Sequence, residues 1–413
     1  MRGTIFTGTS TGCHADCRQP GNRRETPSPN GREALNHPVR YIHSTGGLER
    51  VTRSLASAGD LAVDCEAAGY HRYSDRLCLV QLSTSSETFV LDPLSVDLTP
   101  HLKPHLEDPA RRVLMHGGSY DLRLLRRDLD IAVARLGDTQ VAASFLGEPA
   151  TGLQTLLDKH LGVRLAKKYQ KADWARRPLP RDMIDYAAGD TRHLHRLTDV
   201  LEERLRELGR LHWAEDECRW LVASAAESSK PEIPPDPLTR FKGARRMDAR
   251  TVTALREAIA WRDRIARSLD RAPFRVATDA ALLAAVAARP ASVRQLADVK
   301  GFSPRLAAKS GRSLLEALGR VRRLANRELQ PYPVRRGGRG RPTPEEEATL
   351  DRITAVRNAV AEELGLDRGR VMANHVLREV VAVGPVTPAE LEAMPDVRRW
   401  QVDILGRKLL RAL

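Results

Sequence analysis

Four short apolar runs follow one another in the first half of the chain, and turn residues separate them. They read LAVDCE (61–66), RLCLVQLST (76–84), TFVLD (88–92) and RRVLMHGG (111–118). Runs of this length predict β-strands. Helical spacing follows, with Leu122, Leu125 and Leu129 on one face, and it continues over residues 153–161 and 181–211. Strands followed by helices, with one returning strand, predict a mixed α/β domain of about 180 residues.

Two proline-rich stretches divide the rest of the chain. They read SSKPEIPPDP (228–237) and QPYPVRRGGRGRPTP (330–344), and both are typical of linkers. Residues 1–40 are polar, aperiodic and rich in Gly, Pro, Ser and Thr, which predicts a disordered tail. The expected organisation is a tail (1–40), an α/β domain (41–227), a linker (228–240), a helical domain (241–329), a linker (330–344) and a second helical domain (345–413).

The two helical segments repeat each other at a fixed offset of 95 residues. Pro290 matches Pro385, Leu296 matches Leu391, and other apolar positions match in the same way without a gap. A gapless match that keeps the apolar positions indicates a duplicated domain. Each copy has the periodicity of an all-helical unit.

Basic residues concentrate in the first helical segment and the linker beside it. The chain has a formal net charge of +14. Residues 1–239 have a net charge of −1, residues 240–341 hold 25 basic and 8 acidic residues for a net +17, and residues 342–413 have a net −2. A segment of this kind attracts a polyanion through counterion release, so nucleic acid is the first candidate. The alternative is a solvated helical surface. The near-neutral second copy is expected to serve packing or a partner contact.

Composition argues against several other classes of protein. The longest Ala/Leu/Val run, residues 280–288, is far shorter than a membrane span, and no signal peptide is recognisable, so we expect a cytoplasmic protein. Five scattered cysteines argue against a disulfide framework. Cys13, His14 and Cys17 have zinc-ligand chemistry, but the sequence contains no second cluster of matching spacing. An incidental group in the tail is therefore the favoured interpretation.

An Asp-x-Glu pair lies at the end of the first predicted strand. Side chains alternate along a strand, so Asp64 and Glu66 project from the same face. Two adjacent carboxylates repel each other unless water or a divalent cation offsets the repulsion. Alone, the pair is more typical of a solvated strand end than of a metal site. Cys65 is expected to point to the opposite face, into the core.

Two further acidic positions are predicted to lie on helices. In VLMHGGSYDLRLL, the Gly-Gly pair after His116 predicts a tight turn, Ser119 is a candidate helix cap, and Asp121 falls in the first helical turn. In DYAAGDTRHL, Tyr186 and Asp190 share one helix face, and the small residues between them predict a close approach to another element. Each of these residues also has a structural interpretation. Asp121 would complement the helix dipole, Tyr186 would be packed in the core, and Asp190 would be an ordinary exposed residue.

Together these residues give four carboxylates from three segments, Asp64, Glu66, Asp121 and Asp190. Such a set fits a cage for two hard cations about 4 Å apart, which clamp the attacking and leaving oxygens of an in-line displacement. Oxygen ligands favour Mg²⁺ or Mn²⁺ over zinc. Tyr186 is expected to orient the attacking water, because a phenol is a hydrogen-bond partner rather than a base at neutral pH.

The ordered pattern resembles the Tyr-containing branch of the DEDD superfamily of 3′–5′ exonucleases, and in particular the ribonuclease D family. The three family motifs fall on Asp64/Glu66, on Asp121 and on Tyr186/Asp190. Family-like sequence also occurs in RLCLVQLS, DTQVAASFLG (138–147), GLQTLLDKHLGV (152–163) and DWARRPL (173–179). The helical repeats resemble HRDC domains. Over residues 40–413 the resemblance implies an RNase H-like α/β nuclease domain, a mixed sheet with helices, followed by two small all-α HRDC domains.

The resemblance also implies an activity and partners. It implies a hydrolase that uses two divalent cations, Mg²⁺ or Mn²⁺, to trim RNA 3′ ends such as those of tRNA precursors, releasing nucleoside 5′-monophosphates. The basic first HRDC domain would contact the nucleic acid, and the protein would be a monomer without membrane attachment. Two alternatives stay open: a 3′–5′ DNA exonuclease in repair, and a nucleic-acid-binding scaffold. The complete carboxylate set speaks against the scaffold.

Three other residues are candidates for substrate binding: His116, Gln81 and Arg177. For Gln81 and Arg177 a role in supporting the site is the alternative. A structural role at the strand end competes for His116, and a structural ion pair competes with a phosphate contact for Arg177. Core packing is the favoured interpretation of Trp174. Ala67 replaces the bulky apolar residue that the family often has beside the Glu, which bears on how a terminal base is wedged.

Overall fold

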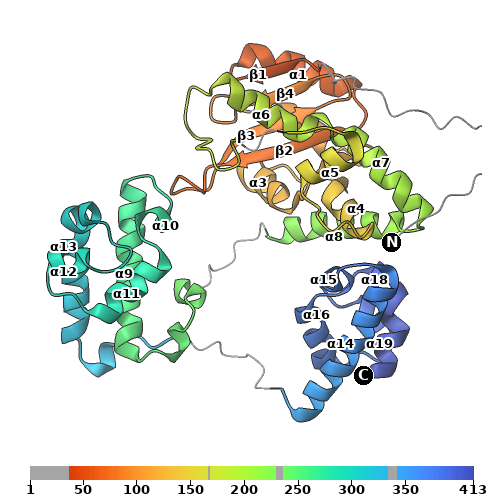
Figure 1. Ribbon diagram of the computed structural model, residues 1–413. Helices are drawn as coiled ribbons and strands as arrows, with labels where there is room; N and C mark the ends of the chain where they lie inside the picture. The colour runs from red at the N-terminus through yellow and green to blue at the C-terminus, as the bar shows by residue number, and fades with distance from the viewer. Residues whose placement is uncertain (1–36, 166–167, 229–235, 334–341) are drawn as a thin grey trace, which may run out of the picture. The chain divides into compact units, whose positions relative to one another are not determined.

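The computed structural model describes residues 37–165, 168–228, 236–333 and 342–413 (Figure 1). Most of the predicted tail, including Cys13, His14 and Cys17, lies outside these ranges, as do residues 229–235 and 334–341 of the two predicted linkers. Within the described ranges, no helix combines the length and the apolar character that crossing a membrane requires.

A mixed β-sheet forms the centre of the N-terminal domain. Six strands are found in the described residues: β1 (Val39–Ile42), β2 (Leu61–Ala67), β3 (Leu77–Ser83), β4 (Thr88–Leu91), β5 (Val113–Met115) and β6 (Leu136–Asp138). Their order in the sheet is β1-β4-β3-β2-β5-β6. Strands β2, β3 and β4 pair antiparallel, β1 pairs parallel with β4, and β5 and β6 extend the sheet parallel to β2. The predicted mixed α/β fold is confirmed.

Two short edge strands, β1 and β6, were not predicted from the pattern of apolar residues. Strand β1 begins at Val39, inside the segment predicted as a tail, and of its four residues only Ile42 is buried. The tail prediction is therefore wrong for its last residues. Strand β6 has three residues with Gly137 at its centre. Neither segment is a continuous apolar run, so neither shows the pattern that revealed the other strands.

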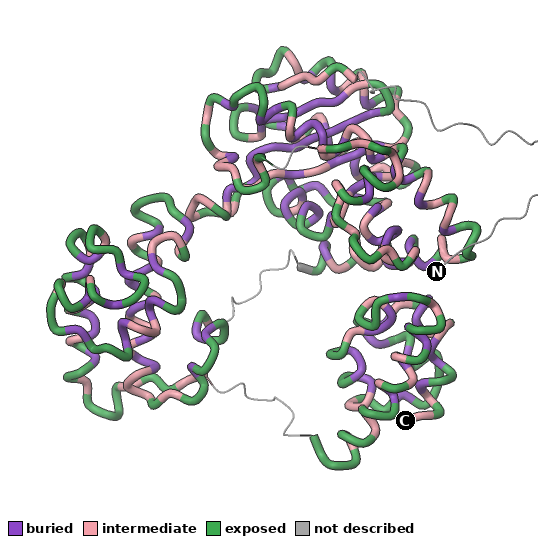
Figure 2. The backbone as a smooth tube through the Cα atoms, in the orientation of Figure 1, coloured by how far each residue is buried: buried purple, intermediate pink, exposed green. Residues whose placement is uncertain are grey.

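Helices pack on both faces of the sheet. They are α1 (Thr45–Ser57), α2 (Thr99–Leu106), α3 (Ser119–Leu129), α4 (Thr139–Phe145), α5 (Leu153–Leu161), α6 (Arg181–Arg192), α7 (Leu194–Glu207) and α8 (Leu211–Ser228). Val63 and Cys65 of β2 point into the core that α1, α2 and α3 share, as expected for Cys65. Leu79 of β3 and Val90 of β4 belong to a separate core with α6. The strands are largely buried (Figure 2).

The helix predicted over residues 181–211 is interrupted, because α6 ends at Arg192 and α7 begins at Leu194. His193, between them, leaves the helical region with φ −108° and ψ 0°. Neither Pro nor Gly marks this position, so the sequence gives no breaker signal for it. Helix α6, which packs on the sheet, is therefore not continuous with α7.

Small residues bring α6 close to the sheet, as predicted. Ala187 is fully buried. A Cβ placed on Gly189 would lie 3.3 Å from Cδ2 of Leu165, which is tighter than most van der Waals contacts. The hydroxyls of Thr191 on α6 and Ser83 on β3 are 2.7 Å apart. The close approach holds the largely apolar buried face of α6 against the strands.

The turn from β5 into α3 has the glycines that its geometry requires. Gly117 has φ +69°, and a Cβ on Gly118 would lie 2.8 Å from Cβ of Met115. Both backbone N–H groups donate to the Asp138 carboxylate, at 3.0 and 2.8 Å. The prediction that Ser119 caps α3 is wrong, because Gly118 occupies the cap position and Ser119 is the first helical residue. Asp138 satisfies this turn instead.

Two helical repeats follow the nuclease-like domain. The first contains α9 (Ala249–Ser268), α10 (Pro273–Val276), α11 (Asp279–Ala288), α12 (Val293–Ala297) and α13 (Pro304–Arg323), with short 3₁₀ turns at Pro237–Arg240, Ala244–Arg246 and Asn326–Glu328. The second contains α14 (Pro344–Leu364), α15 (Arg368–Val371), α16 (Asn374–Val383), α17 (Pro388–Glu392), α18 (Arg399–Gln401) and α19 (Arg407–Ala412), the last two joined by a π-helical segment, Val402–Gly406.

The predicted duplication is confirmed helix by helix. Each of the helices α9 to α13 begins 95 residues before its counterpart among α14 to α18. A buried arginine is also repeated: Arg262 donates to the carbonyl of Ala277, and Arg357 donates to that of Met372. These carbonyls are likewise 95 residues apart, so the two copies keep the same internal bond.

Candidate active site

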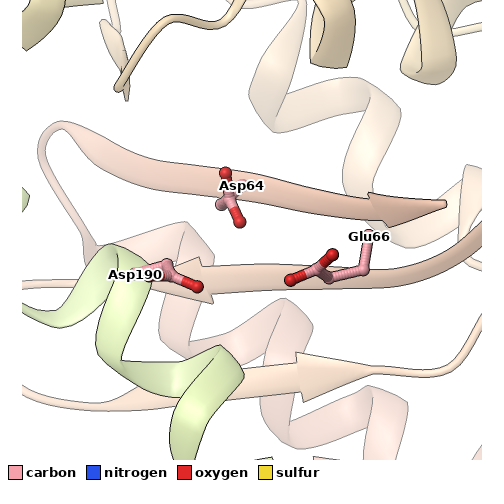
Figure 3. Close-up of side chains that lie close together, drawn as sticks. All are labelled: Asp64, Glu66 and Asp190. Carbon is pink, nitrogen blue, oxygen red and sulfur yellow. The ribbon is translucent and has the colours of Figure 1, made fainter. Parts of the chain in front are cut away.

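Three carboxylates converge on the face of the sheet that α6 covers (Figure 3). Asp64 and Glu66 project from β2 and Asp190 projects from α6, and one oxygen of each lies within 4.8 Å of the other two. A β-bulge between Glu66 and Ala67 shifts the register where the strand leaves the site. The predicted Asp-x-Glu pair therefore faces a helix and a third carboxylate rather than open solvent.

Asp121 lies beside this cluster without joining it. It occupies the first turn of α3 and is 7% exposed. Burial and the Asp64 carboxylate raise the pKa of Asp121, and Asp121 in turn helps to raise the pKa of Glu66. In the described residues the group within 4.8 Å contains three of the four predicted ligands. The fourth, Asp121, is close enough to interact electrostatically with Asp64 and Glu66.

Burial and mutual repulsion disfavour the charged form of these acids. Burial raises the pKa of Asp64 to about 7, and burial together with Asp64 raises the pKa of Asp190 to about 8. Burial and the neighbouring carboxylates also raise the pKa of Glu66 well above its ordinary value. No Lys, Arg or His in the described part of the chain forms an ion pair with any of the three. A divalent cation is the charge that this donor set fits.

Tyr186 lies on the same face of α6, one turn before Asp190. Its ring stacks on Trp174, with centroids 6.1 Å apart, and meets the edge of Tyr169 at 5.8 Å. Burial, Asp190 and Glu66 raise the pKa of the Tyr186 phenol above its ordinary value. The phenol therefore stays protonated at neutral pH, and its hydroxyl is available to donate a hydrogen bond. Trp174 is 2% exposed, which agrees with its predicted packing role.

Gln81 lies next to this site but is not exposed at its surface. It lies opposite Asp64 in the β2–β3 ladder and is fully buried. An RNA strand has no access to a side chain with zero exposure. The prediction that Gln81 binds substrate directly is therefore wrong.

Arg177 lies in a buried ion pair rather than in a phosphate site. Its Nε and Nη2 donate to the two oxygens of Asp92, at 2.6 and 2.7 Å. Its remaining N–H groups donate to the backbone carbonyls of Cys78, Trp174 and Arg176. All five donors are thus engaged, and none is left for a phosphate. The structure supports the ion-pair interpretation and corrects the substrate-binding one.

His116 lies half-buried against Thr139, the first residue of α4. Its Nδ1 is 2.9 Å from the Thr139 hydroxyl, and burial lowers its pKa. It lies outside the carboxylate group. The contact with Thr139 supports the structural alternative for His116.

Two acidic residues that organise the site were missed in the sequence. Asp92 is fully buried and accepts from both Arg177 and the Tyr41 hydroxyl, which lies 2.6 Å away. Asp138 holds the glycine turn that precedes Asp121. Asp138 ends β6 and Asp92 directly follows β4, and an Asp in such a position is the one signal that could have revealed them.

Comparison with known proteins places these features in one family. A family model described as 3′–5′ exonuclease matches residues 39–206, and an HRDC domain model matches residues 253–318 and again 346–413. The chain is 30% identical to ribonuclease D of Acidiphilium cryptum (strain JF-5) over 393 residues, which is 93% of this chain and 94% of the relative. This chain belongs to the ribonuclease D family.

Other comparisons agree with this membership. Ribonuclease D of Gluconacetobacter diazotrophicus is 33% identical over 307 residues, 73% of this chain and 76% of the relative. The catalytic core of RRP6 from Trypanosoma brucei is 26% identical with a TM-score of 0.59, over 70% of this chain and 80% of that one. Escherichia coli RNase D shares the fold, with a TM-score of 0.65 at 23% identity over 92% and 98% of the two chains.

Family membership establishes the reaction class. The chain is a 3′–5′ exoribonuclease, a hydrolase of phosphodiester bonds, with a nuclease domain followed by HRDC repeats. The acidic cluster on β2 and α6 fits divalent-metal binding, and nucleic acid is the substrate class. The predicted enzyme class is confirmed, and the scaffold alternative is set aside.

Proposed function

We propose that this exoribonuclease trims the 3′ ends of structured RNA, with tRNA precursors as its substrates, by hydrolysis that depends on two divalent cations. The convergence of Asp64, Glu66 and Asp190 within 4.8 Å, without a basic partner in the described residues, carries the proposal. Acids held this close with raised pKa values reduce the stability of a fold. Such groups are concentrated at functional sites. The products expected are nucleoside 5′-monophosphates.

We assign the metal ligands to Asp64, Glu66, Asp190 and Asp121. Carboxylate oxygens without histidine or thiolate favour Mg²⁺ or Mn²⁺. Divalent cations bound at such a site acidify the attacking water and stabilise charge on the leaving 3′ oxygen. Two ions, rather than one, would account for Asp121 at the edge of the group.

Tyr186 and its aromatic support position the attacking water. The raised pKa keeps the phenol protonated, so that it donates a hydrogen bond and does not remove a proton. Trp174 and Tyr169 fix the ring from two sides, and this leaves the hydroxyl little freedom. The small residues of α6 set the distance between this helix and the acids on β2. The helix thus delivers both a ligand and a water-orienting group.

The basic first repeat supplies the RNA contact in this proposal. Residues 240–341 have a net charge of +17, whereas residues 342–413 have a net −2. Phosphate contacts from such a segment would add affinity for a folded RNA beyond its 3′ end. Escherichia coli RNase D is described as an exoribonuclease involved in structured RNA processing, which supports the choice of substrate. A monomer that acts in the cytoplasm completes the proposal.

We further propose the domain limits that the sequence indicated, with the nuclease domain starting at β1. The exonuclease would then extend from Val39 to residue 227, and the HRDC domains would occupy residues 241–329 and 345–413.

A trimming assay tests the proposal. A tRNA precursor with a short 3′ trailer is incubated with the purified chain and Mg²⁺, beside a single-stranded DNA of equal length. The proposal expects stepwise shortening of the RNA, release of 5′-monophosphates and no reaction in EDTA. A strong preference for the DNA would overturn the substrate assignment. An unchanged rate in EDTA would overturn the metal assignment.

A further inference from the structure

Gln81 has an unusual environment for an amide. Its side chain has zero exposure, and neither its Nε2 nor its Oε1 has a hydrogen-bond partner. Ser83, two residues further along β3 on the same face, shows the contrast: its hydroxyl bonds both Thr88 and Thr191. A buried amide without a partner is costly, and such groups in folded proteins usually mark a partner that the fold alone does not supply.

The position of Gln81 identifies the group that it faces. Gln81 and Asp64 are direct partners across the antiparallel β2–β3 pair. Side chains of directly opposed residues lie on the same face, with Cβ atoms about 5 Å apart. Asp64 is one of the three clustered carboxylates. The free amide is therefore next to a candidate metal ligand.

The chemistry of an amide suits this neighbour. An amide N–H donates to a carboxylate oxygen without neutralising its charge, whereas Lys or Arg would compete with the cation. Ligating carboxylates in metal sites are themselves held by hydrogen bonds from a surrounding layer of residues. A leucine or valine, like those elsewhere on β3, would pack equally well but could not donate.

We propose that Gln81 is a positioning residue of the metal centre: its Nε2 donates to the Asp64 carboxylate once a cation is bound and holds that carboxylate in its ligating orientation. This inference rests on the proposed metal dependence. Gln81 touches neither the RNA nor the reacting atoms, and it acts only through Asp64. In the metal-free protein it contributes no hydrogen bond to the fold.

The test measures metal binding rather than activity. The full chain is stripped with EDTA, and Mn²⁺ is titrated while free Mn²⁺ is followed by electron paramagnetic resonance. The variant is Gln81→Met, which keeps the length of the side chain and removes both polar atoms. The matched control is Gln401→Leu, because Gln401 is also buried but its Nε2 donates to the Val371 carbonyl at 3.0 Å.

The expected results separate positioning from a structural role. Gln81→Met should weaken Mn²⁺ binding about 10–100-fold, the usual cost of losing such a partner, while the melting temperature of the metal-free protein is unchanged or higher. Gln401→Leu should do the opposite, lowering the metal-free melting temperature and leaving Mn²⁺ affinity unchanged. Gln81→Leu provides a second variant if Gln81→Met does not fold.

Three outcomes are distinguishable. Wild-type Mn²⁺ affinity in a folded Gln81→Met variant would overturn the inference while leaving the metal site intact. Loss of metal-free stability in both Gln81 variants, as in the control, would make Gln81 a structural residue and also overturn it. Failure of the wild-type chain to bind Mn²⁺ would instead count against the proposed function.

Discussion

Asp64 on β2 and Gln81 on β3 face each other across one rung of the sheet, an acid whose pKa is raised to about 7 beside an amide that has no partner. In the metal-free fold the charged form of Asp64 is unfavourable and the amide of Gln81 is unsatisfied. Both would gain from a cation, the acid by direct ligation and the amide through the acid. We therefore expect the site to reduce the stability of the metal-free fold.

Removing one acid should stabilise the metal-free protein and abolish trimming. Asp190→Asn keeps the shape of the side chain and removes a charge that burial and Asp64 disfavour. In EDTA at pH 8.5 we expect the melting temperature to rise by at least about 2 °C. Asp199→Asn, on the exposed face of α7, is the control and should change neither property. An Asp190→Asn variant with wild-type trimming would remove Asp190 from the ligand set.

Metal-free stability should fall as the pH rises through the neutral range. The pKa of Asp64 is about 7 and that of Asp190 about 8 in the fold, against ordinary values near 4 in the unfolded chain. Between these limits the folded state holds more protons than the unfolded state, so increasing pH favours unfolding. The cluster's stabilising contribution is complete below about pH 4 and is lost towards pH 8.

The measurement is the difference in melting temperature between wild type and the Asp64→Asn/Asp190→Asn double variant, in EDTA from pH 5 to 9. Subtracting the variant cancels the titration of groups outside the carboxylate cluster. The wild type should lose stability relative to the variant as pH rises. Mn²⁺ affinity of the wild type should increase over the same range, because ligands bind as carboxylates. A difference that is independent of pH would contradict the assigned burial of these acids.

Tyr186→Phe should reduce the rate without affecting the fold or metal binding. The ring contacts with Trp174 and Tyr169 remain in the variant, and only the hydroxyl is removed. We expect a fall in kcat of about 10²–10³-fold, the usual effect of removing one donor at a reacting centre. Melting temperature and Mn²⁺ affinity are measured beside kcat. A large loss of Mn²⁺ affinity would show that the phenol supports the ligands instead.

Arg177→Ala should destabilise the nuclease domain strongly. It would leave Asp92 as an unpaired charge with zero exposure, at a cost of about 3–5 kcal/mol. Urea unfolding followed by circular dichroism measures this cost. If Arg177 served mainly as a phosphate contact, the variant would keep its stability and lose RNA affinity.

An exposed basic face on the first repeat should determine part of the salt dependence of RNA binding. Arg305, Lys309 and Arg312 follow helical spacing on α13, are all exposed, and form no ion pair in the described residues. Changing all three to Gln should reduce the slope of log K against log salt by up to about 0.7 for each phosphate that these side chains neutralise.

The matched control is a triple Gln variant of exposed basic residues of the second repeat, Arg378, Arg407 and Arg411, which likewise form no ion pair in the described residues. Its slope should equal that of the wild type. If both triple variants have the same slope of log K against log salt, the basic residues changed on the first repeat do not contribute to RNA binding.

Sequence patterns predicted long elements and ordered motifs better than local partners. Strands β2 to β5 lie in apolar runs and were recognisable, whereas β1 (VRYI) and β6 (LGD) are interrupted by polar residues or glycine. The carboxylates were found because their residue types and order are distinctive, even though Asp190 follows Glu66 at long range. The 95-residue offset found in the sequence is also the offset between corresponding helix starts of the two copies.

The errors concern contacts that depend on register and packing. Gln81 could be placed opposite Asp64 only after the β2–β3 register was known. Whether Arg177 binds a phosphate or Asp92 depends on how the loop before α6 folds, and single-residue patterns do not contain that information. Ser119 matched the composition of a cap, but the turn is satisfied from β6 by Asp138 instead.

The most direct test of the carboxylate cluster is product analysis with one substrate and two proteins. A tRNA precursor with a labelled 3′ trailer is incubated in Mg²⁺ with the wild type or with Asp64→Asn, and the products are identified by mass spectrometry. We expect 5′-monophosphates from the wild type and intact precursor with the variant, although the variant is folded and at least as stable in EDTA. Monophosphate release by Asp64→Asn at the wild-type rate would contradict this expectation.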